Sequence, residues 1–269
     1  MSELILTERP RPGVLLIRLN RADALNAMNA PLVEALHAVL ADVRHDSQTR
    51  AIVLTGNGRA FCAGIDLRGY GTPPGAVDGE GRAQAGMRVQ QHIASLVEAF
   101  RGARPPVVAA INGAAAGGGM ALALMADVRI MADNAALHAS FINRGQSSCD
   151  IGVSWLLPRM IGFSRAAEIL LTGRPVDAAE CERVGIVSSV EPAERLLDAA
   201  LDTAENIARN SPFGVWMTKE VMWSNLEVPS LRAAIDLENR TQILAAMTKD
   251  HREAVYSFLE KRPPVYENH

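Results

Sequence analysis

The chain has 269 residues, of which 48% are hydrophobic and 4% aromatic, and its 27 basic and 30 acidic residues give a net charge of −3. This length allows one large core with a smaller appended subdomain. The balanced charge and the scarcity of aromatic residues argue against a nucleic-acid-binding protein.

The N-terminal sequence MSELILTERP has no basic segment followed by a long apolar one, and no stretch of about 18 apolar residues is free of charge and glycine. We therefore expect no signal peptide and no membrane partner. Cys62, Cys149 and Cys181 are odd in number, far apart and not spaced as zinc ligands. They predict reduced thiols in the cytoplasm and no metal site.

Strand-like and helix-like segments alternate over the first two thirds of the chain. Expected strands lie at 4–7, 14–19, 51–55, 107–111 and 128–131, the first two as a hairpin or as neighbours. Expected helices begin at Pro31, at about Met87 after a mobile Gly- and Pro-rich loop (67–86), and after the glycines at 117–119. This alternation predicts an α/β fold with parallel strand pairs.

From about residue 192 the apolar residues recur at helical spacing, and helices are expected at 194–209, 213–223, 230–247 and 250–261. We therefore expect an α/β core over residues 1–191 and a helical C-terminal region over residues 192–269, serving oligomerisation and pocket closure.

Two strand-to-glycine junctions share a form. One expected strand leads into FCAGIDL (61–67), and another leads into Gly117-Gly118-Gly119 and a helix. A helix N-terminus presents unpaired N–H groups, and glycine lets a ligand approach them. If the junctions meet in space, their N–H groups form a pair of donors that can stabilise an oxyanion. The alternative is that the glycines only permit tight packing of helix on strand.

The order and spacing of both junctions resemble the enoyl-CoA hydratase/isomerase (crotonase) family. The matching stretches are 20–29, 56–67, 111–130, 162–187 and 258–266, which together span nearly the whole chain. The resemblance implies a crotonase-like spiral of ββα/βαβ turns with a helical C-terminal region. It also implies a homotrimer or dimer of trimers and an acyl-CoA substrate, whose coenzyme A is the thioester part of the substrate and not a permanently bound cofactor.

The resemblance also assigns residues. It places the oxyanion hole at the backbone N–H groups of Ile65 and Gly118. Phe258 and Lys261 match residues that contact coenzyme A, often from a neighbouring subunit. Without the resemblance, Lys261 would be read as a solvated helix end. The positions that match the lining of the coenzyme A nucleotide are Ala24, Leu25, Ala63, Gly64, Asp66 and Leu67.

The chain departs from the family where hydratases carry two glutamates. Ala121 matches the first, and Phe141 or Ile142 matches the second, depending on where a one-residue insertion is placed between Gly145 and Asp150. Water addition needs a proton donor and an activated nucleophile. These apolar residues supply neither, which argues against ordinary hydration.

Asp150 matches an aspartate of isomerase-like members, and a carboxylate beside an apolar pocket has a raised pKa that suits proton shuttling. The alternative is a helix N-cap ahead of residues 151–157. One shuttling base with an oxyanion hole is enough to move a double bond. A non-catalytic acyl-CoA-binding protein, a divergent hydratase, a decarboxylase and a thioester hydrolase remain alternatives.

The other candidate residues favour structural roles. We expect Asp127 to be a structural acceptor, His138 and Cys149 to pack, and His37 and His45 to face solvent. Arg144 is a candidate partner for Asp150 or for a substrate carboxylate, with a surface charge as the alternative.

Overall fold

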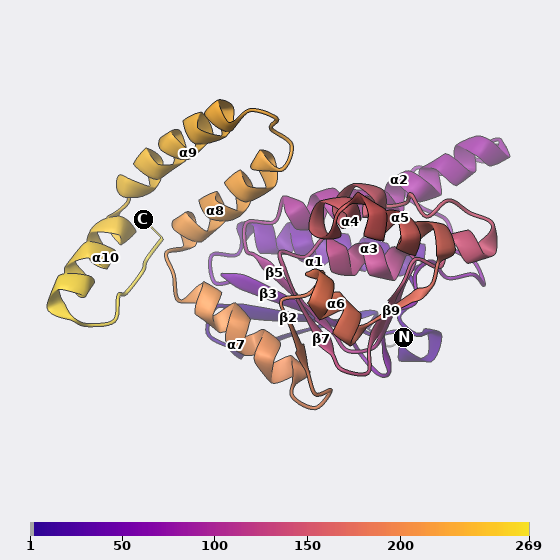
Figure 1. Ribbon diagram of the computed structural model, residues 1–269, viewed down its shortest axis with the longest axis horizontal. Helices are drawn as coiled ribbons and strands as arrows, with labels where there is room; N and C mark the ends of the chain where they lie inside the picture. The colour runs from indigo at the N-terminus through magenta and orange to yellow at the C-terminus, as the bar shows by residue number, and fades with distance from the viewer. Residues whose placement is uncertain (1–2, 269) are drawn as a thin grey trace.

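A six-stranded sheet forms the centre of the computed structural model, which describes residues 3–268 (Figure 1). Its strands lie in the order β1-β2-β3-β5-β7-β10, and only β1 and β2 pair antiparallel. The expected hairpin and the expected parallel pairs are therefore confirmed. The strands are β1 (Ile5–Arg11), β2 (Val14–Leu19), β3 (Ala51–Gly56), β5 (Val107–Ile111), β7 (Val128–Ala132) and β10 (Ser189–Glu191).

A second sheet of four short strands runs in the order β4-β6-β8-β9. Strands β4 (Ala60–Cys62), β6 (Ala114–Ala116) and β8 (Ala136–His138) are parallel, and β9 (Pro175–Asp177) is antiparallel to β8. Each of β3, β5 and β7 is followed by a strand of this second sheet and then by a helix. The chain thus makes three successive β–β–α turns, which bring the ends of β4, β6 and β8 side by side.

The helices of the body follow the strands closely. Asn29 caps α1 (Ala30–His45) by accepting a hydrogen bond from the N–H of Leu32 at 3.1 Å. Helix α2 begins at Arg82, five residues before the expected start. The sequence missed these first turns because they are solvent-exposed and carry no apolar stripe. The bounds are α2 (Arg82–Arg101), α3 (Gly118–Leu124), α4 (Val153–Ile161), α5 (Phe163–Thr172), α6 (Ala178–Val184) and α7 (Leu196–Ala208). Helix α7 packs against β3, β5 and β7.

Helices α8 (Pro212–Asn225), α9 (Leu231–Ala246) and α10 (Lys249–Glu260) extend away from the sheets as an arm (Figure 1). No residue of α9 is buried. Large apolar side chains on the arm face solvent, among them Leu231, Ile243, Met247, Phe258 and Leu259. A single copy of the chain therefore leaves much of this apolar surface uncovered.

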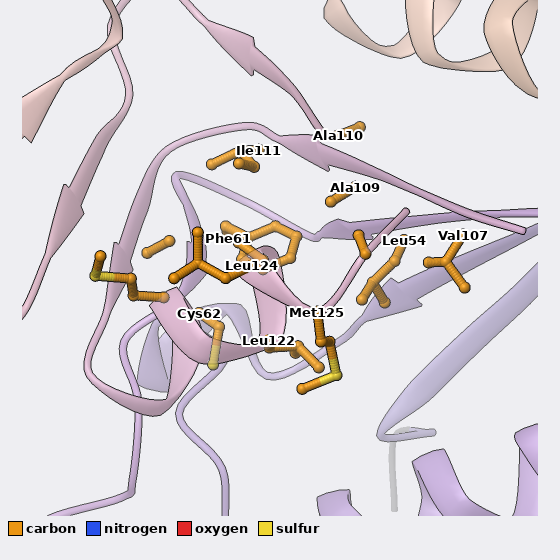
Figure 2. Packing of buried hydrophobic residues seen from close by; sticks show 14 of the residues in the cluster. Leu54, Phe61, Cys62, Val107, Ala109, Ala110, Ile111, Leu122, Leu124 and Met125 are labelled. Atoms are coloured by element: carbon orange, nitrogen blue, oxygen red, sulfur yellow. The ribbon is translucent and has the colours of Figure 1, made fainter. Parts of the chain in front are cut away.

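Helix α3 lies in the core against β4 and β6 of the second sheet and against α4. All seven of its residues are buried, and Figure 2 shows Leu122 and Leu124 in the same apolar cluster as Phe61 of β4. Burying a large apolar side chain stabilises a fold by about 1.5–3 kcal/mol. This packing fixes the first residue of α3, Gly118, relative to the end of β4.

Candidate functional site

The two glycine junctions meet in space. Gly64 follows β4 with a φ of +91°, and Gly118 is the first residue of α3. A Cβ added to Gly64 would lie 3.2 Å from the backbone N of Gly118 and 2.6 Å from the carbonyl O of Ala116. A Cβ on Gly118 would lie 3.8 Å from the Cα of Gly64. The backbone segments therefore touch, with no room for a side chain between them.

The local hydrogen bonds leave the backbone N–H groups of Ile65 and Gly118 without a partner within residues 3–268. The N–H of Met28 donates to the carbonyl O of Gly64 at 2.7 Å, and the N–H of Asp66 donates to the carbonyl O of Met28 at 2.9 Å. This parallel bridge uses the groups on both sides of Ile65. The N–H of Gly118, in the first turn of α3, precedes the intrahelical hydrogen bonds. Within residues 3–268, neither the Ile65 nor the Gly118 N–H donates a hydrogen bond.

Apolar side chains surround these backbone groups. A Cβ on Gly118 would lie 2.5 Å from Cε of Met28 and 3.3 Å from Cδ1 of Ile151, and one on Gly117 would lie 3.4 Å from Cε1 of Phe141. In such surroundings a hydrogen bond to a developing negative charge is stronger than in water. The arrangement can bind a polarised carbonyl oxygen.

Asp150 precedes Ile151 directly and is half-buried. Its side chain accepts a hydrogen bond from the amide of Gln90 on α2. Burial raises the pKa of Asp150, while the hydrogen bonds from Gln90 and from the backbone N–H of Ile151 oppose the rise. The next residue, Ile151, places its Cδ1 3.3 Å from the position of a Cβ on Gly118, so the turn that carries Asp150 packs against the start of α3.

The helix-cap alternative for Asp150 is wrong. The N-cap of α4 is Gly152, and no side chain caps this helix. Asp150 accepts from the N–H of Val153 through its backbone carbonyl, at 2.9 Å, so its carboxylate is not the cap. Ile151 adopts a φ of +44°, which is unusual for a β-branched residue and indicates that the turn is held by its surroundings.

The positions that we expected to match the two hydratase glutamates are apolar and differ in exposure. Ala121 is fully buried in α3, Phe141 is buried against Gly117, and Ile142 is exposed. None of these side chains can accept or donate a proton.

The six residues expected to line a coenzyme A nucleotide lie on two segments that pair with each other. The N–H of Ala63 donates to the carbonyl O of Leu25 at 3.0 Å, which joins the segment of Ala24 and Leu25 to the segment that continues through Gly64. Asp66 forms an ion pair with Arg21 at 2.8 Å, and this pairing lowers the pKa of Asp66. Leu67, the next residue, is exposed.

Phe258 and Lys261 do not join the other predicted residues within this chain. Both belong to α10 and its end, and Figure 1 shows α10 far from α3. Phe258 is 82% exposed. The residues that the sequence groups into one site are thus divided between the body and the arm.

Most of the remaining candidates have structural partners. Asp127 accepts from Nζ of Lys219 at 3.0 Å and from Nε1 of Trp223 at 2.7 Å, as a structural acceptor would. Arg144 donates to Oγ of Ser140 at 2.8 Å instead of pairing with Asp150.

His37 hydrogen-bonds Ser95 of α2 at 2.9 Å, so the expectation that it faces solvent is wrong. Cys149 is exposed, so the expectation that it packs is also wrong. His138 lies in β8, and its carbonyl O accepts from the N–H of Gly117 at 2.9 Å.

Residues 3–268 contain neither a metal-binding cluster nor a membrane-spanning helix. No group of three or more His, Cys, Asp and Glu side chains in this range could hold a metal ion. No helix in this range is long and apolar enough to cross a membrane.

Gln90 is the residue of this site that the sequence does not point to. It lies within the helical pattern of α2, 60 positions before Asp150, and belongs to no motif. A glutamine at one helical position carries no local signal of a partner that only the tertiary fold supplies.

Comparisons with known proteins agree with the geometry. The sequence profile of the enoyl-CoA hydratase/isomerase family matches residues 9–269. The chain is 40% identical over 264 residues to the probable enoyl-CoA hydratase EchA12 of Mycobacterium tuberculosis, covering 98% of this chain and 92% of that one. It is 36% identical over 267 residues to the 1,2-epoxyphenylacetyl-CoA isomerase of Escherichia coli, covering 99% of each.

The fold agrees as well. A crystal structure of a probable enoyl-CoA hydratase/isomerase from Mycobacterium abscessus superposes with a TM-score of 0.91 at 38% identity, covering 99% of each chain. The expected crotonase-like fold is therefore confirmed. The chain belongs to the enoyl-CoA hydratase/isomerase family of enzymes.

Proposed function

We propose that the protein binds an acyl-CoA, stabilises the thioester enolate with the N–H groups of Ile65 and Gly118, and moves a double bond with Asp150 as the shuttling base. The observation that carries this proposal is the contact of Gly64 with Gly118. Asp150 is half-buried and directly precedes Ile151, whose side chain approaches Gly118. One relative is named as the isomerase of a coenzyme A thioester, which supports isomerisation as the general reaction class.

The reaction requires a proton to leave one carbon and return to another. In a 3-enoyl thioester, Asp150 accepts the proton of the α-carbon, and the electron pair of that C–H bond delocalises onto the thioester oxygen. The two N–H groups stabilise the resulting oxyanion, and losing one such donor in comparable sites costs roughly 3–4 kcal/mol. Asp150 then returns the proton to the γ-carbon, which leaves the double bond conjugated with the thioester.

The coenzyme A part of the substrate supplies the remaining contacts in this proposal. The paired segments of Ala24, Leu25, Ala63, Gly64, Asp66 and Leu67 bind the nucleotide. Phe258 and Lys261 act on a neighbouring copy in a homotrimer or dimer of trimers, which the exposed apolar surface of the arm supports. No further cofactor takes part, and the unpaired cysteines support a cytoplasmic location.

The test is a panel of 3-enoyl-CoA and 2-enoyl-CoA substrates with product analysis, comparing the wild type with Asp150→Asn. We expect the wild type to isomerise 3-enoyl-CoA and the variant to bind acyl-CoA with its activity reduced at least about 100-fold. Equal isomerisation by both proteins would exclude Asp150 as the base.

A non-catalytic acyl-CoA-binding protein is the competing function, and the apolar residues at 121 and 141 favour it over a hydratase. It predicts tight acyl-CoA binding with no exchange of the α-proton for deuterium in D₂O. Exchange that depends on Asp150 would exclude it, and products of hydration, decarboxylation or thioester cleavage would identify a different enolate reaction.

A further inference from the structure

The side chain of Asp150 has one side-chain hydrogen-bond partner among residues 3–268, the amide of Gln90. Gln90 lies on α2 and Asp150 lies in the turn before α4, so the bond joins two elements that are separated by 60 residues in sequence. The Nε2 of Gln90 donates to Oδ1 of Asp150. Both residues are half-buried, and so the bond is shielded from much of the solvent.

Helix α2 is fixed on both sides of Gln90. Two residues before it, Arg88 donates to both carboxylate oxygens of Glu80, at 3.2 and 2.5 Å. Two residues after it, Nδ1 of His92 hydrogen-bonds the hydroxyl of Tyr70 at 2.7 Å. Glu80 and Tyr70 belong to the loop that follows Asp66. The same loop therefore holds the part of α2 that presents Gln90 to Asp150.

An amide suits the support of a base that must both lose and regain a proton. Its N–H stabilises the ionised carboxylate, and because the amide does not titrate it does not compete for the substrate proton. Burial raises the pKa of Asp150, and the groups that oppose this rise are the amide of Gln90 and the N–H of Ile151, neither of which is charged. A cation in place of the amide would hold the carboxylate ionised and weaken it as a base.

We propose that Gln90 is the positioning residue of the reaction: it anchors Oδ1 of Asp150 so that the carboxylate stays oriented and ionised for proton transfer. The inference rests on the proposed role of Asp150 as the shuttling base. It assigns to α2 a part in the reaction.

Gln90→Met tests the proposal, because methionine keeps the length of the side chain and removes the hydrogen bond. We expect kcat for 3-enoyl-CoA isomerisation to fall about 10- to 100-fold, the range for a hydrogen bond to a charged group, with KM changed by less than about threefold. The acid limb of the pH–rate profile should move to higher pH, since the ionised carboxylate has lost a donor. Gln90→Glu should move it further, because two adjacent carboxyls resist ionising together.

Gln91→Met is the matched control. Gln91 is the next residue of α2 and is exposed, so this change should leave kcat, KM and the pH profile at wild-type values. Melting temperatures and circular dichroism of all variants check that they fold. A Gln90→Met protein with wild-type kcat and pH profile overturns the inference.

A second readout does not depend on turnover. The titration of the Asp150 carboxyl can be followed by infrared difference spectra of each protein against the same protein with Asp150→Asn. An upward shift in Gln90→Met supports the inference even if the substrate panel contains no good substrate, and an unchanged titration overturns it. If Asp150→Asn keeps full isomerase activity, the proposed function fails instead, whatever Gln90 does.

Discussion

Gly64 and Gly118 stand backbone to backbone, and a Cβ on Gly64 would lie 3.2 Å from the N of Gly118 and 2.6 Å from the O of Ala116. Gly64→Ala should therefore force these segments apart and also strain a φ of +91°. We expect a loss of at least about 100-fold in kcat, from misplaced donors, together with a lower melting temperature.

Gly86→Ala is the control for this change. Gly86 lies in the exposed first turns of α2, where a Cβ meets no atom within 4 Å, so alanine should stabilise the helix by about 0.5–1 kcal/mol and leave activity unchanged. Steady-state kinetics and thermal unfolding measure both variants. Wild-type activity in Gly64→Ala would show that the Gly64–Gly118 contact is not needed for catalysis.

Placing a glutamate at position 121 should not create a hydratase. Ala121 is fully buried in a helix whose residues are all buried, so the larger charged side chain should lower the free energy of unfolding by about 3 kcal/mol or more. Ala121→Gln carries the same bulk without the charge and separates the two effects. Urea unfolding measures the loss, and a stable Ala121→Glu protein that hydrates 2-enoyl-CoA would contradict this prediction.

Asp150→Asn should make the protein more stable at neutral pH. The folded state raises the pKa of Asp150 above its ordinary value of 3.8, so between that value and the raised one the folded protein binds more protons than the unfolded chain. The free energy of unfolding of the wild type therefore falls as the pH rises through this window. The substituted amide side chain does not ionise, so it avoids the loss, and its oxygen can still accept from Gln90.

The measurement is thermal unfolding of both proteins from about pH 3 upward, in steps of about one unit across the window set by the shift. The two curves should meet below the ordinary pKa of aspartate and diverge above it. Asp78→Asn, at an exposed position of the loop, should follow the wild type. Parallel curves for wild type and Asp150→Asn would show that burial does not raise the pKa of this carboxyl.

Lys219→Met should be strongly destabilising although it lies far along the sequence from the proposed base. The side chain of Lys219 is 5% exposed and donates to Asp127 at 3.0 Å and to the carbonyls of Phe100 and Pro105. Removing one partner of a buried ion pair costs about 3–5 kcal/mol. Calorimetry measures the loss, and Lys249→Met, on the exposed arm, is the comparison expected to stay near the wild type.

Phe258 and Lys261 should act on a neighbouring copy of the chain. The double variant Phe258→Ala/Lys261→Ala should weaken acyl-CoA binding without lowering the stability of its own body, because both side chains are exposed. When its subunits are mixed with Asp150→Asn subunits, some sites gain an intact Asp150 and an intact α10 from different chains. Activity should therefore return on mixing, whereas a site completed within one chain predicts no recovery.

The sequence predicted the parallel core well because its strands are continuous apolar runs bounded by glycine or proline. Strand β5 begins and ends at the expected residues, 107 and 111. The prediction of secondary structure failed at the start of α2. The first turns of this helix are exposed, so the sequence there shows no apolar residues at helical spacing. His37 was misjudged because its partner, Ser95, comes from a helix that is distant in sequence.

For the site, the sequence could indicate the backbone donors only through glycine spacing and family resemblance, since Ile65 and Gly118 bear no reactive side chain. The sequence left two roles open for Asp150, a catalytic base or a helix cap. The structure excludes the helix cap because Gly152 is the N-cap of α4. Gln90 could not be found, because a single hydrogen bond between distant elements has no counterpart in local periodicity.

The side chain of Ile151, the residue after the proposed base, packs beside Gly118, one of the proposed oxyanion donors. A substitution at Ile151 would therefore disturb the proposed base and the proposed donors at the same time. A protein engineer who alters the acyl preference should therefore keep Gln90 and the contacts of α2 with Tyr70 and Glu80 that support it, and should leave the turn at 150–152 untouched. The proposed base, its positioning residue and the proposed donors would then have to be conserved together in any redesign.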